Sequence, residues 1–220
     1  MTCAPLKVGF DLDGVLLYNP LRMTRPLISF LKRKKIAIQR KDLEFYVPKS
    51  GFEQYLWELF HKSSVFLAPG FSQIAILKQK KLITPYLITG RFGHLQQDFD
   101  QWKQKMNADE LFAGCYMNDQ EEQPHLFKER MIKELKLDVF IEDNWDIVRY
   151  LDKNCCFSQE VTRNKHNQNQ KQSQNQKHNQ NNKTQIIWVS NLFDFKIKYH
   201  SKAINFKKAL SLISFPSPSA

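Results

Sequence analysis

The chain has 220 residues, of which 42% are hydrophobic, and this suits one substantial domain with a small insertion. Its formal net charge of +11 at pH 7 is compatible with nucleic acid or another anionic partner, of which nucleic acid is not favoured, and it does not indicate a fold. No apolar run approaches the length of a membrane-spanning helix, and the four cysteines show neither a metal-site spacing nor a Cys-x-x-Cys pair. The N-terminus leads almost directly into a predicted strand, so we expect no cleaved signal and a cytoplasmic location.

Short apolar runs alternate with segments of helical periodicity along most of the chain. Leu95, Phe99, Trp102 and Met106 recur on one helical face, and a second such segment runs from Phe127 to Leu135. Strands separated by helices indicate a parallel sheet, so the sequence predicts an α/β, Rossmann-like fold with helices on both faces. Strands are expected at Leu6–Phe10, Pro85–Thr89, Leu111–Met117, Val139–Glu142 and Ile186–Val189.

The first two predicted strands are separated by about 70 residues, far more than one connecting helix needs. Two apolar stripes with helical spacing lie in this interval: Leu27, Phe30 and Leu31, and then Phe52, Tyr55, Leu56, Leu59 and Phe60. We therefore expect a small helical cap at residues 19–68, inserted into a core that comprises residues 1–18 and 69–213.

A polar, low-complexity segment interrupts the second half of the chain. Residues 164–182 contain no aliphatic or aromatic side chain, so they cannot bury enough surface to offset the entropy of ordering them. We expect residues 159–184 to form a disordered, Asn/Gln-rich insertion within the core, before the last strand. Residues 214–220 are expected to form a loose tail.

Polar side chains follow the predicted strands at the points where they end. Ligands of open parallel sheets bind outside the carboxyl ends of the strands, so we expect these side chains to converge at one edge. Lys128, from the helix before the fourth strand, joins them. The residues at the strand ends are Asp11, Asp13 and Gly14 after the first, Thr89, Gly90 and Arg91 at the second, and Glu142, Asp143 and Asp146 at the fourth.

This set suits a divalent cation and a phosphoryl group. Magnesium prefers hard oxygen ligands, and Asp11 and Asp143 can supply carboxylates from neighbouring strands. Asp11 can also attack phosphorus, since aspartyl-phosphate formation is a known covalent route. If the extended period continues, Asp13 points to the same side, where it can protonate the leaving oxygen and later deprotonate the attacking water.

The remaining groups at this edge would bind and neutralise the phosphoryl group. Thr89 can donate a hydrogen bond to a phosphoryl oxygen, and Lys128 can neutralise its growing charge. Gly14 and Gly90 allow backbone amides to approach the anion closely. Arg91 either binds substrate phosphate or forms an ion pair with a nearby acid.

The motifs, in this order, resemble those of the haloacid dehalogenase-like hydrolase superfamily. Residues 11–15 (DLDGV) are similar to its first motif, residues 87–91 (LITGR) to its second, Lys128 to its third and residues 142–146 (EDNWD) to its acidic fourth. The resemblance covers roughly residues 6–155 and implies a Mg²⁺-dependent phosphatase. It implies Asp11 as nucleophile, Asp13 as acid/base with its carbonyl on Mg²⁺, and Asp143 as metal ligand. Either Asp143 acts alone in this role, or Glu142 or Asp146 shares or replaces it.

The cap and the LITGR motif are together similar to the 5′-nucleotidase-like branch of that superfamily. We therefore expect hydrolysis of a small phosphomonoester, with nucleotides among the candidates. Two alternatives stay open: a phosphatase of polynucleotide ends, suggested by the charge, and a non-enzymatic phosphate-binding scaffold, disfavoured because both aspartates are present. A calcium loop is disfavoured because Gly14 comes too early in the pattern.

Overall fold

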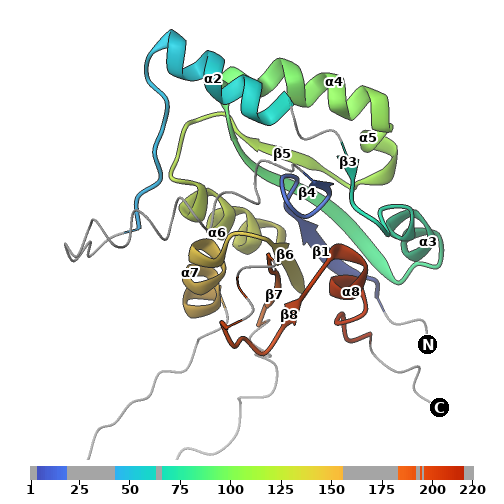
Figure 1. Cartoon of the computed structure of the whole chain (residues 1–220). Coiled ribbons are helices and arrows are strands. Elements are labelled where there is room, and N and C mark those ends of the chain that lie inside the picture. The colour runs from blue at the N-terminus through green and yellow to red at the C-terminus, as the bar shows by residue number, and fades with distance from the viewer. Residues whose placement is uncertain are drawn as a thin grey trace, which may run out of the picture.

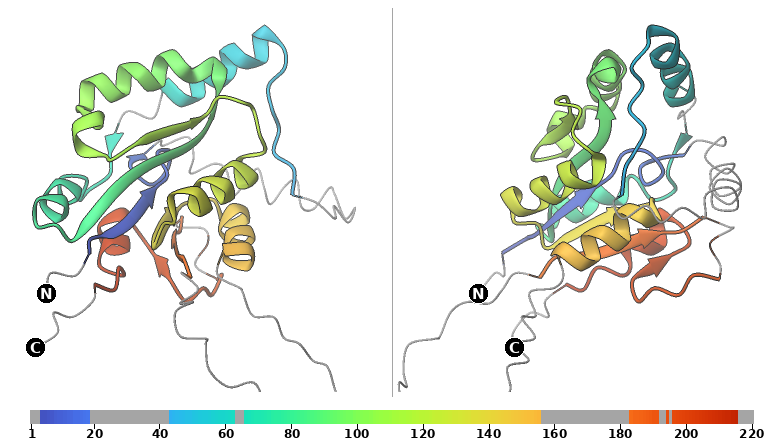
Figure 2. Two further views of the ribbon diagram at one scale, coloured as in Figure 1. Left: turned by 180° about the vertical axis from the view of Figure 1, so that it is seen from behind. Right: turned by 90° about the vertical axis from the view of Figure 1, so that its left-hand side faces the viewer.

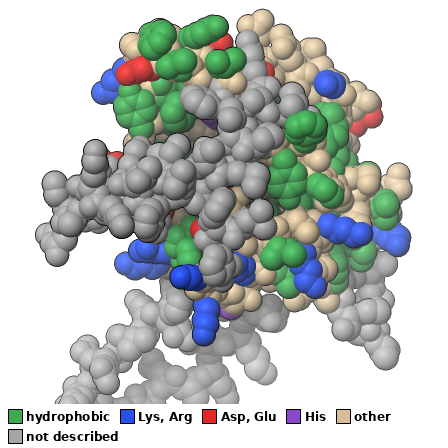
Figure 3. Space-filling model, viewed as in Figure 1, with side chains coloured by type: hydrophobic (Ala, Val, Ile, Leu, Met, Phe, Trp, Pro, Cys, Tyr) green, Lys and Arg blue, Asp and Glu red, His purple; other side chains and the backbone are tan. Residues whose placement is uncertain are grey.

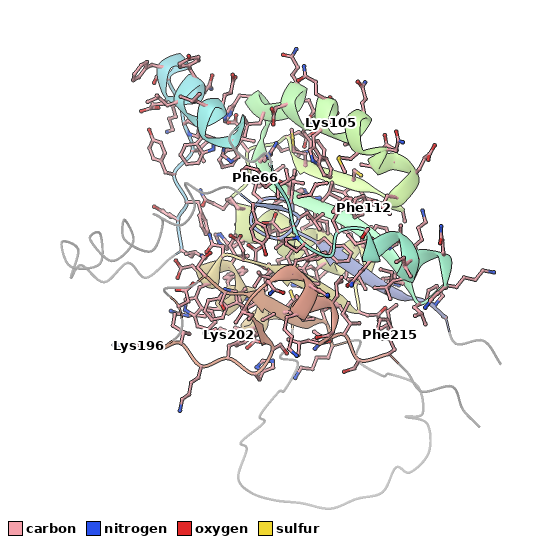
Figure 4. The ribbon with its side chains drawn as sticks, turned by 45° about the vertical axis from the view of Figure 1, so that its right-hand side comes forward. Phe66, Lys105, Phe112, Lys196, Lys202 and Phe215 are labelled. Carbon is pink, nitrogen blue, oxygen red and sulfur yellow. The ribbon has the colours of Figure 1, made fainter. Side chains whose placement is uncertain are left out.

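The computed structural model describes residues 4–18, 43–62, 66–155, 183–191, 194 and 196–215 (Figure 1). The first predicted cap stripe, the polar segment at 164–182 and the tail beyond residue 215 lie outside these residues. Two residues assigned to the insertion or the tail belong to the core. Thr184 is buried and its hydroxyl donates to the carbonyl of Leu137 at 2.7 Å, and Phe215 packs against the hydrophobic core (Figure 4).

A six-stranded sheet with parallel pairing throughout forms the centre of the fold, in the order β5-β4-β1-β6-β7-β8. The predicted Rossmann-like parallel sheet is confirmed. Phe10 at the end of β1 pairs with Leu87 of β4 and Ile141 of β6, so the three strands that carry the predicted site are neighbours. The strands are β1 (Leu6–Phe10), β4 (Ile83–Phe92), β5 (Cys115–Asn118), β6 (Val139–Glu142), β7 (Gln185–Val189) and β8 (Lys202–Ala203).

Three elements differ from the expected ones. The second predicted strand is longer, from Ile83 to Phe92, and the third begins at Cys115, because Ala108–Leu111 forms a short helix, α5. The sheet also gains β8, which is followed by α8 (Phe206–Leu210). A two-residue strand and a five-residue helix are too short to show a hydrophobic period.

Helices cover both faces of the sheet, because alternate strand residues point to opposite sides. Val8, Phe10 and Ile141 pack on one side against α3 (Gln73–Gln79), α4 (Gln96–Met106) and α8. Phe140 and Trp188 pack on the other side against α6 (Pro124–Leu135) and α7 (Trp145–Cys155). Figure 1 shows α6 and α7 together on one side, with α3 and α8 on the other.

Close packing explains the glycine in the middle of β1. A Cβ at Gly9 would lie 2.5 Å from Cδ1 of Leu137 and 2.7 Å from Cδ2 of Phe140. These two side chains occupy the space beside the strand, so any larger residue at position 9 would force them to move.

The cap segment leaves and re-enters the core through a small two-stranded sheet. β2 (Leu17–Tyr18) pairs antiparallel with β3 (Phe66–Leu67). Between them, α2 (Gly51–Lys62) lies close to α4 in both further views (Figure 2). The second predicted stripe therefore falls on a helix, but its side chains at Phe52, Tyr55, Leu56 and Leu59 are exposed, as Figure 3 shows over α2.

The side chain of Gln123 ties the segment before α2 to the core. It accepts a hydrogen bond from the backbone N–H of Phe45 at 2.7 Å and donates one to the carbonyl of the same residue at 3.3 Å. Since Gln123 directly precedes α6, this contact places the cap segment beside the helix that carries Lys128. In the part of the chain described here, no helix is both long and apolar enough to cross a membrane.

Candidate active site

The two aspartates of the first motif lie where β1 ends and the chain turns. The backbone N–H of Asp11 donates to the carbonyl of Ile141 at 3.0 Å, so the pairing of β1 with β6 extends to this residue. Asp13 lies within the turn that follows, and Gly14 has a φ of 89° there, a conformation that favours glycine. The backbones of the two aspartates are therefore held differently, that of Asp11 by the sheet and that of Asp13 by a turn.

Lys128 lies between two buried carboxylates. Its Nζ is 3.1 Å from Oδ1 of Asp11 and 2.5 Å from Oε2 of Glu142, and the three side chains are at most 5% exposed. Burial lowers the pKa of Lys128, but the attraction of Asp11 and Glu142 outweighs it, so the net pKa is raised and the ammonium stays charged. Burial is also the main reason why the pKa of Glu142 is raised, with Lys128 opposing it.

Gly90 gives α6 room to bring this lysine to the site. A Cβ at Gly90 would lie 3.2 Å from Cβ of Pro124, the first residue of α6, and 3.7 Å from Cε of Lys128. Gly90 thus packs against the start of α6 and against the aliphatic part of the Lys128 side chain. This packing role was not apparent from the sequence, which suggested only close approach of an anion.

Three acids form a cluster that suits a divalent cation. Carboxylate oxygens of Asp11, Glu142 and Asp143 lie within 4.8 Å of one another, and all three residues are buried. With Lys128, the cluster carries a formal charge of −2, which matches a divalent ion with hard oxygen ligands. The indole N–H of Trp188 donates to the backbone carbonyl of Asp143 at 3.1 Å and fixes this turn.

Among the described residues, this cluster contains Glu142 but not the carboxylate of Asp13 or of Asp146. Glu142 thus lies where it could share the metal role predicted for Asp143. The backbone N–H of Asp146 donates to Oδ1 of Asn144 at 3.0 Å, in the first turn after β6. The expectation that Asp13 contributes its backbone carbonyl to the metal stays a prediction.

Arg91 forms an ion pair with Asp13, one of the two alternatives that the sequence left open. Its Nε is 2.7 Å from Oδ2 of Asp13 and its Nη2 is 2.9 Å from Oδ1. Its Nη1 is 2.7 Å from Oδ2 of Asp98, in the first turn of α4. Burial lowers the pKa of Arg91, but the two carboxylates outweigh it and the net pKa is raised. No pattern in the sequence pointed to Asp98.

Thr89 is fully buried in β4, three residues before the strand ends at Phe92. Its Oγ1 accepts a hydrogen bond from the backbone N–H of Arg91 at 3.3 Å, and the register with β5 shifts between Thr89 and Phe92. Such irregularities redirect side chains at the end of a strand. Thr89 and Arg91 lie at the same edge of the sheet as Asp11. Hydrogen bonding of Thr89 to a phosphoryl group stays a prediction.

No protein-family model and no curated protein matches the sequence. The fold is similar to several solved structures. CbbY from Rhodobacter sphaeroides, in complex with phosphate, is 11% identical, with 92% of this chain and 95% of that chain covered and a TM-score of 0.48. A haloacid dehalogenase-like family hydrolase from Streptococcus pneumoniae is 13% identical, with 69% and 81% covered and a TM-score of 0.41.

A third structure is a HAD family enzyme from Bacteroides thetaiotaomicron, in complex with magnesium and inorganic phosphate. It is 14% identical, with 66% of this chain and 88% of that chain covered and a TM-score of 0.38. Two of these three proteins carry the name of the superfamily that the four motifs resemble. None of the three names refers to a 5′-nucleotidase, and that branch stays a prediction.

Proposed function

We propose that this chain is a haloacid dehalogenase-like hydrolase, a Mg²⁺-dependent phosphatase that acts on a small phosphomonoester through an aspartyl-phosphate on Asp11. The observation that carries this proposal is the buried ion-pair cluster at the end of β1. A carboxylate at a strand end lies beside a buried ammonium group and two further acids. A nucleophile that attacks an anionic phosphoryl group needs such positive charge beside it.

The side chains divide the reaction between them. Asp11 attacks phosphorus, a P–O bond to its carboxylate forms, and the bond to the leaving alcohol oxygen breaks. Asp13 gives a proton to that oxygen and then takes one from the water that hydrolyses the aspartyl-phosphate, releasing inorganic phosphate. Lys128 neutralises charge on the phosphoryl oxygens, and Thr89 donates a hydrogen bond to one of them.

Asp11, Asp143 and Glu142 would hold the magnesium ion, together with the carbonyl of Asp13. When bound, the ion screens the repulsion between the carboxylate nucleophile and the phosphate. The donor set is all oxygen and acidic, which is the chemistry that magnesium prefers.

The test is a hydrolysis assay on small phosphomonoesters and on 5′- or 3′-phosphorylated oligonucleotides, with Mg²⁺ or with EDTA. We expect activity on small substrates that disappears in EDTA and falls by about 10³-fold or more in Asp11→Asn. Asp109→Asn, an exposed acid on α5, is the matched control and should leave the activity unchanged. Acid quenching followed by mass spectrometry should find phosphate on Asp11.

Hydrolysis that survives EDTA or Asp11→Asn would contradict the mechanism. A preference for oligonucleotides would favour the polynucleotide-end alternative, which rests on the net charge of +11. Binding of phosphate compounds with no hydrolysis of any of them would favour the scaffold alternative.

A further inference from the structure

Arg91 is a buried arginine that the proposed reaction does not use. We propose that it is a positioning residue: it holds Asp13 in the orientation from which Asp13 protonates the leaving oxygen. This inference rests on the proposed function, in which Asp13 is the acid/base residue. It replaces the other role that the sequence allowed for Arg91, which was to bind the substrate phosphate.

The geometry of the contact fixes the plane of the Asp13 carboxylate. Nε and Nη2 of Arg91 donate to the two different carboxylate oxygens, at 2.7 Å and 2.9 Å. Two parallel bonds between a planar guanidinium and a planar carboxylate restrict rotation about the last side-chain torsion, which a single bond would not. A carboxylate has about four lone-pair sites, so this fork engages both oxygens without using all their capacity.

Asp13 needs support of this kind because its backbone lies outside the strands of the six-stranded sheet and forms an isolated bridge with Leu17. Asp11 is paired with β6 through its own N–H, whereas Asp13 lies in a turn that continues through Gly14. Arg91 instead belongs to β4, next to β1 in the sheet. The arginine thus links the acid/base residue to a rigid strand, two residues beyond Thr89.

The surroundings of Arg91 argue against a direct contact with phosphate. All three of its guanidinium nitrogens already donate to carboxylates, two to Asp13 and one to Asp98. The side chain is only 2% exposed. A phosphate that took the place of Asp13 would break a buried, bidentate ion pair, which is costly because the displaced carboxylate stays in a buried site.

The leaving group provides a test that separates positioning from general damage. p-Nitrophenolate is a stable anion and leaves without a proton, whereas an alkoxide requires one, so only alkyl phosphates depend on Asp13 as an acid. The quantity to compare is kcat/KM, because it reports the phosphoryl transfer to Asp11 and excludes the later hydrolysis step, in which Asp13 also takes part. The substrates are p-nitrophenyl phosphate and glycerol 2-phosphate, assayed at one pH.

We expect Arg91→Gln to lower kcat/KM for glycerol 2-phosphate by about 10²-fold, the size of the loss when a catalytic group is misplaced by about 1 Å. The loss on p-nitrophenyl phosphate should be much smaller, and Asp13→Asn should show the same pattern. Arg91→Lys should not rescue, because an ammonium group lacks the fork. Arg130→Gln is the matched control: Arg130 lies on α6, forms partly exposed ion pairs with Glu122 and Glu134, and its replacement should leave both values unchanged.

Asp98→Asn tests the same inference through the second carboxylate that contacts Arg91. This variant replaces Arg91→Gln in the test if Arg91→Gln does not fold. Asp98 is 26% exposed and contacts Nη1 of Arg91, so its loss should give the same substrate pattern in weaker form. Equal losses on both substrates with weaker inhibition by inorganic phosphate would overturn the proposal in favour of phosphate binding. Unchanged values in both variants, or a uniform loss in Asp13→Asn, would also overturn it. A wild-type protein without hydrolysis would instead refute the proposed function itself.

Discussion

Replacing Lys128 by methionine should destabilise the protein strongly, because it removes the ammonium group from a cluster of buried acids. Lys128 contacts Asp11 and Glu142 at 3.1 Å and 2.5 Å, and the three side chains are 3%, 5% and 0% exposed. Removing one partner of a buried ion pair leaves an uncompensated buried charge and typically costs about 3–5 kcal/mol. Since the free energy of unfolding of such domains is about 5–15 kcal/mol, the variant should remain folded but lose much of its stability.

The assay is urea unfolding at fixed pH in EDTA, since a bound divalent cation would offset part of the lost positive charge. Lys103→Met is the matched control, because Lys103 pairs with Asp100 at 2.9 Å on the surface of α4. Such exposed pairs contribute about 0–1 kcal/mol. In the double variant Lys128→Met/Glu142→Gln one buried carboxylate is also neutralised, so it should be more stable than Lys128→Met by about 0.5–3 kcal/mol.

Two results would refute this reasoning. If Lys128→Met cost no more than Lys103→Met, the acids around Lys128 could not be the charged, buried groups described above. If the double variant were less stable than Lys128→Met alone, Glu142 would not be the carboxylate that Lys128 compensates.

Three further predictions concern glycines and a thiol. Gly9→Ala should lower the free energy of unfolding in urea by about 1–3 kcal/mol, because the added methyl group overpacks the core. Gly51→Ala, where the added methyl group would meet nothing within 4 Å, should leave the stability unchanged or raise it. Equal effects of the two substitutions would contradict this prediction. Gly90→Ala should lower kcat by about tenfold with little loss of stability, because the added methyl group shifts the start of α6 by a few tenths of an ångström and moves Lys128 with it. An unchanged kcat would show that the helix adjusts without moving Lys128. Burial raises the pKa of Cys115 to about 11, so at pH 8 its alkylation, followed by peptide mass spectrometry, should be about 10²-fold slower than that of free cysteine and should rise toward pH 11. Rapid alkylation of Cys115 at pH 8 would contradict that prediction.

The strands that carry the site were predictable because they are short, buried apolar runs bounded by polar residues. β1 and β6 have the predicted bounds, since buried parallel strands are apolar on both faces and their ends coincide with the change to carboxylates. Lys128 was also identified, because a lysine near the start of the helix before β6 lies on the same side of the sheet as the strand ends. In each case the order of the residues along the chain was enough to predict their position, because parallel strands bring their carboxyl ends to the same edge of the sheet.

The contacts that complete the site were not predictable in the same way. The sequence left Arg91 between two roles, because its choice of partner depends on how the turn at Asp13 and the first turn of α4 approach it. Nothing in the spacing of Trp188 shows that its indole holds the carbonyl of Asp143, 45 residues earlier. The packing of Gly90 against Pro124 likewise depends on the angle at which α6 leaves β5.

The two aspartates of DLDGV are held by two arrangements of the same kind. Asp11 shares Lys128 with Glu142, and Asp13 shares Arg91 with Asp98, so each aspartate lies beside a cation that a second acid also contacts. The cations differ as the proposed roles require. A lysine offers a compact charge that can turn toward an incoming phosphoryl group, whereas an arginine fork fixes the plane of a carboxylate. In the proposed reaction one aspartate would attack and the other would hold a fixed orientation, although both come from the same five-residue motif.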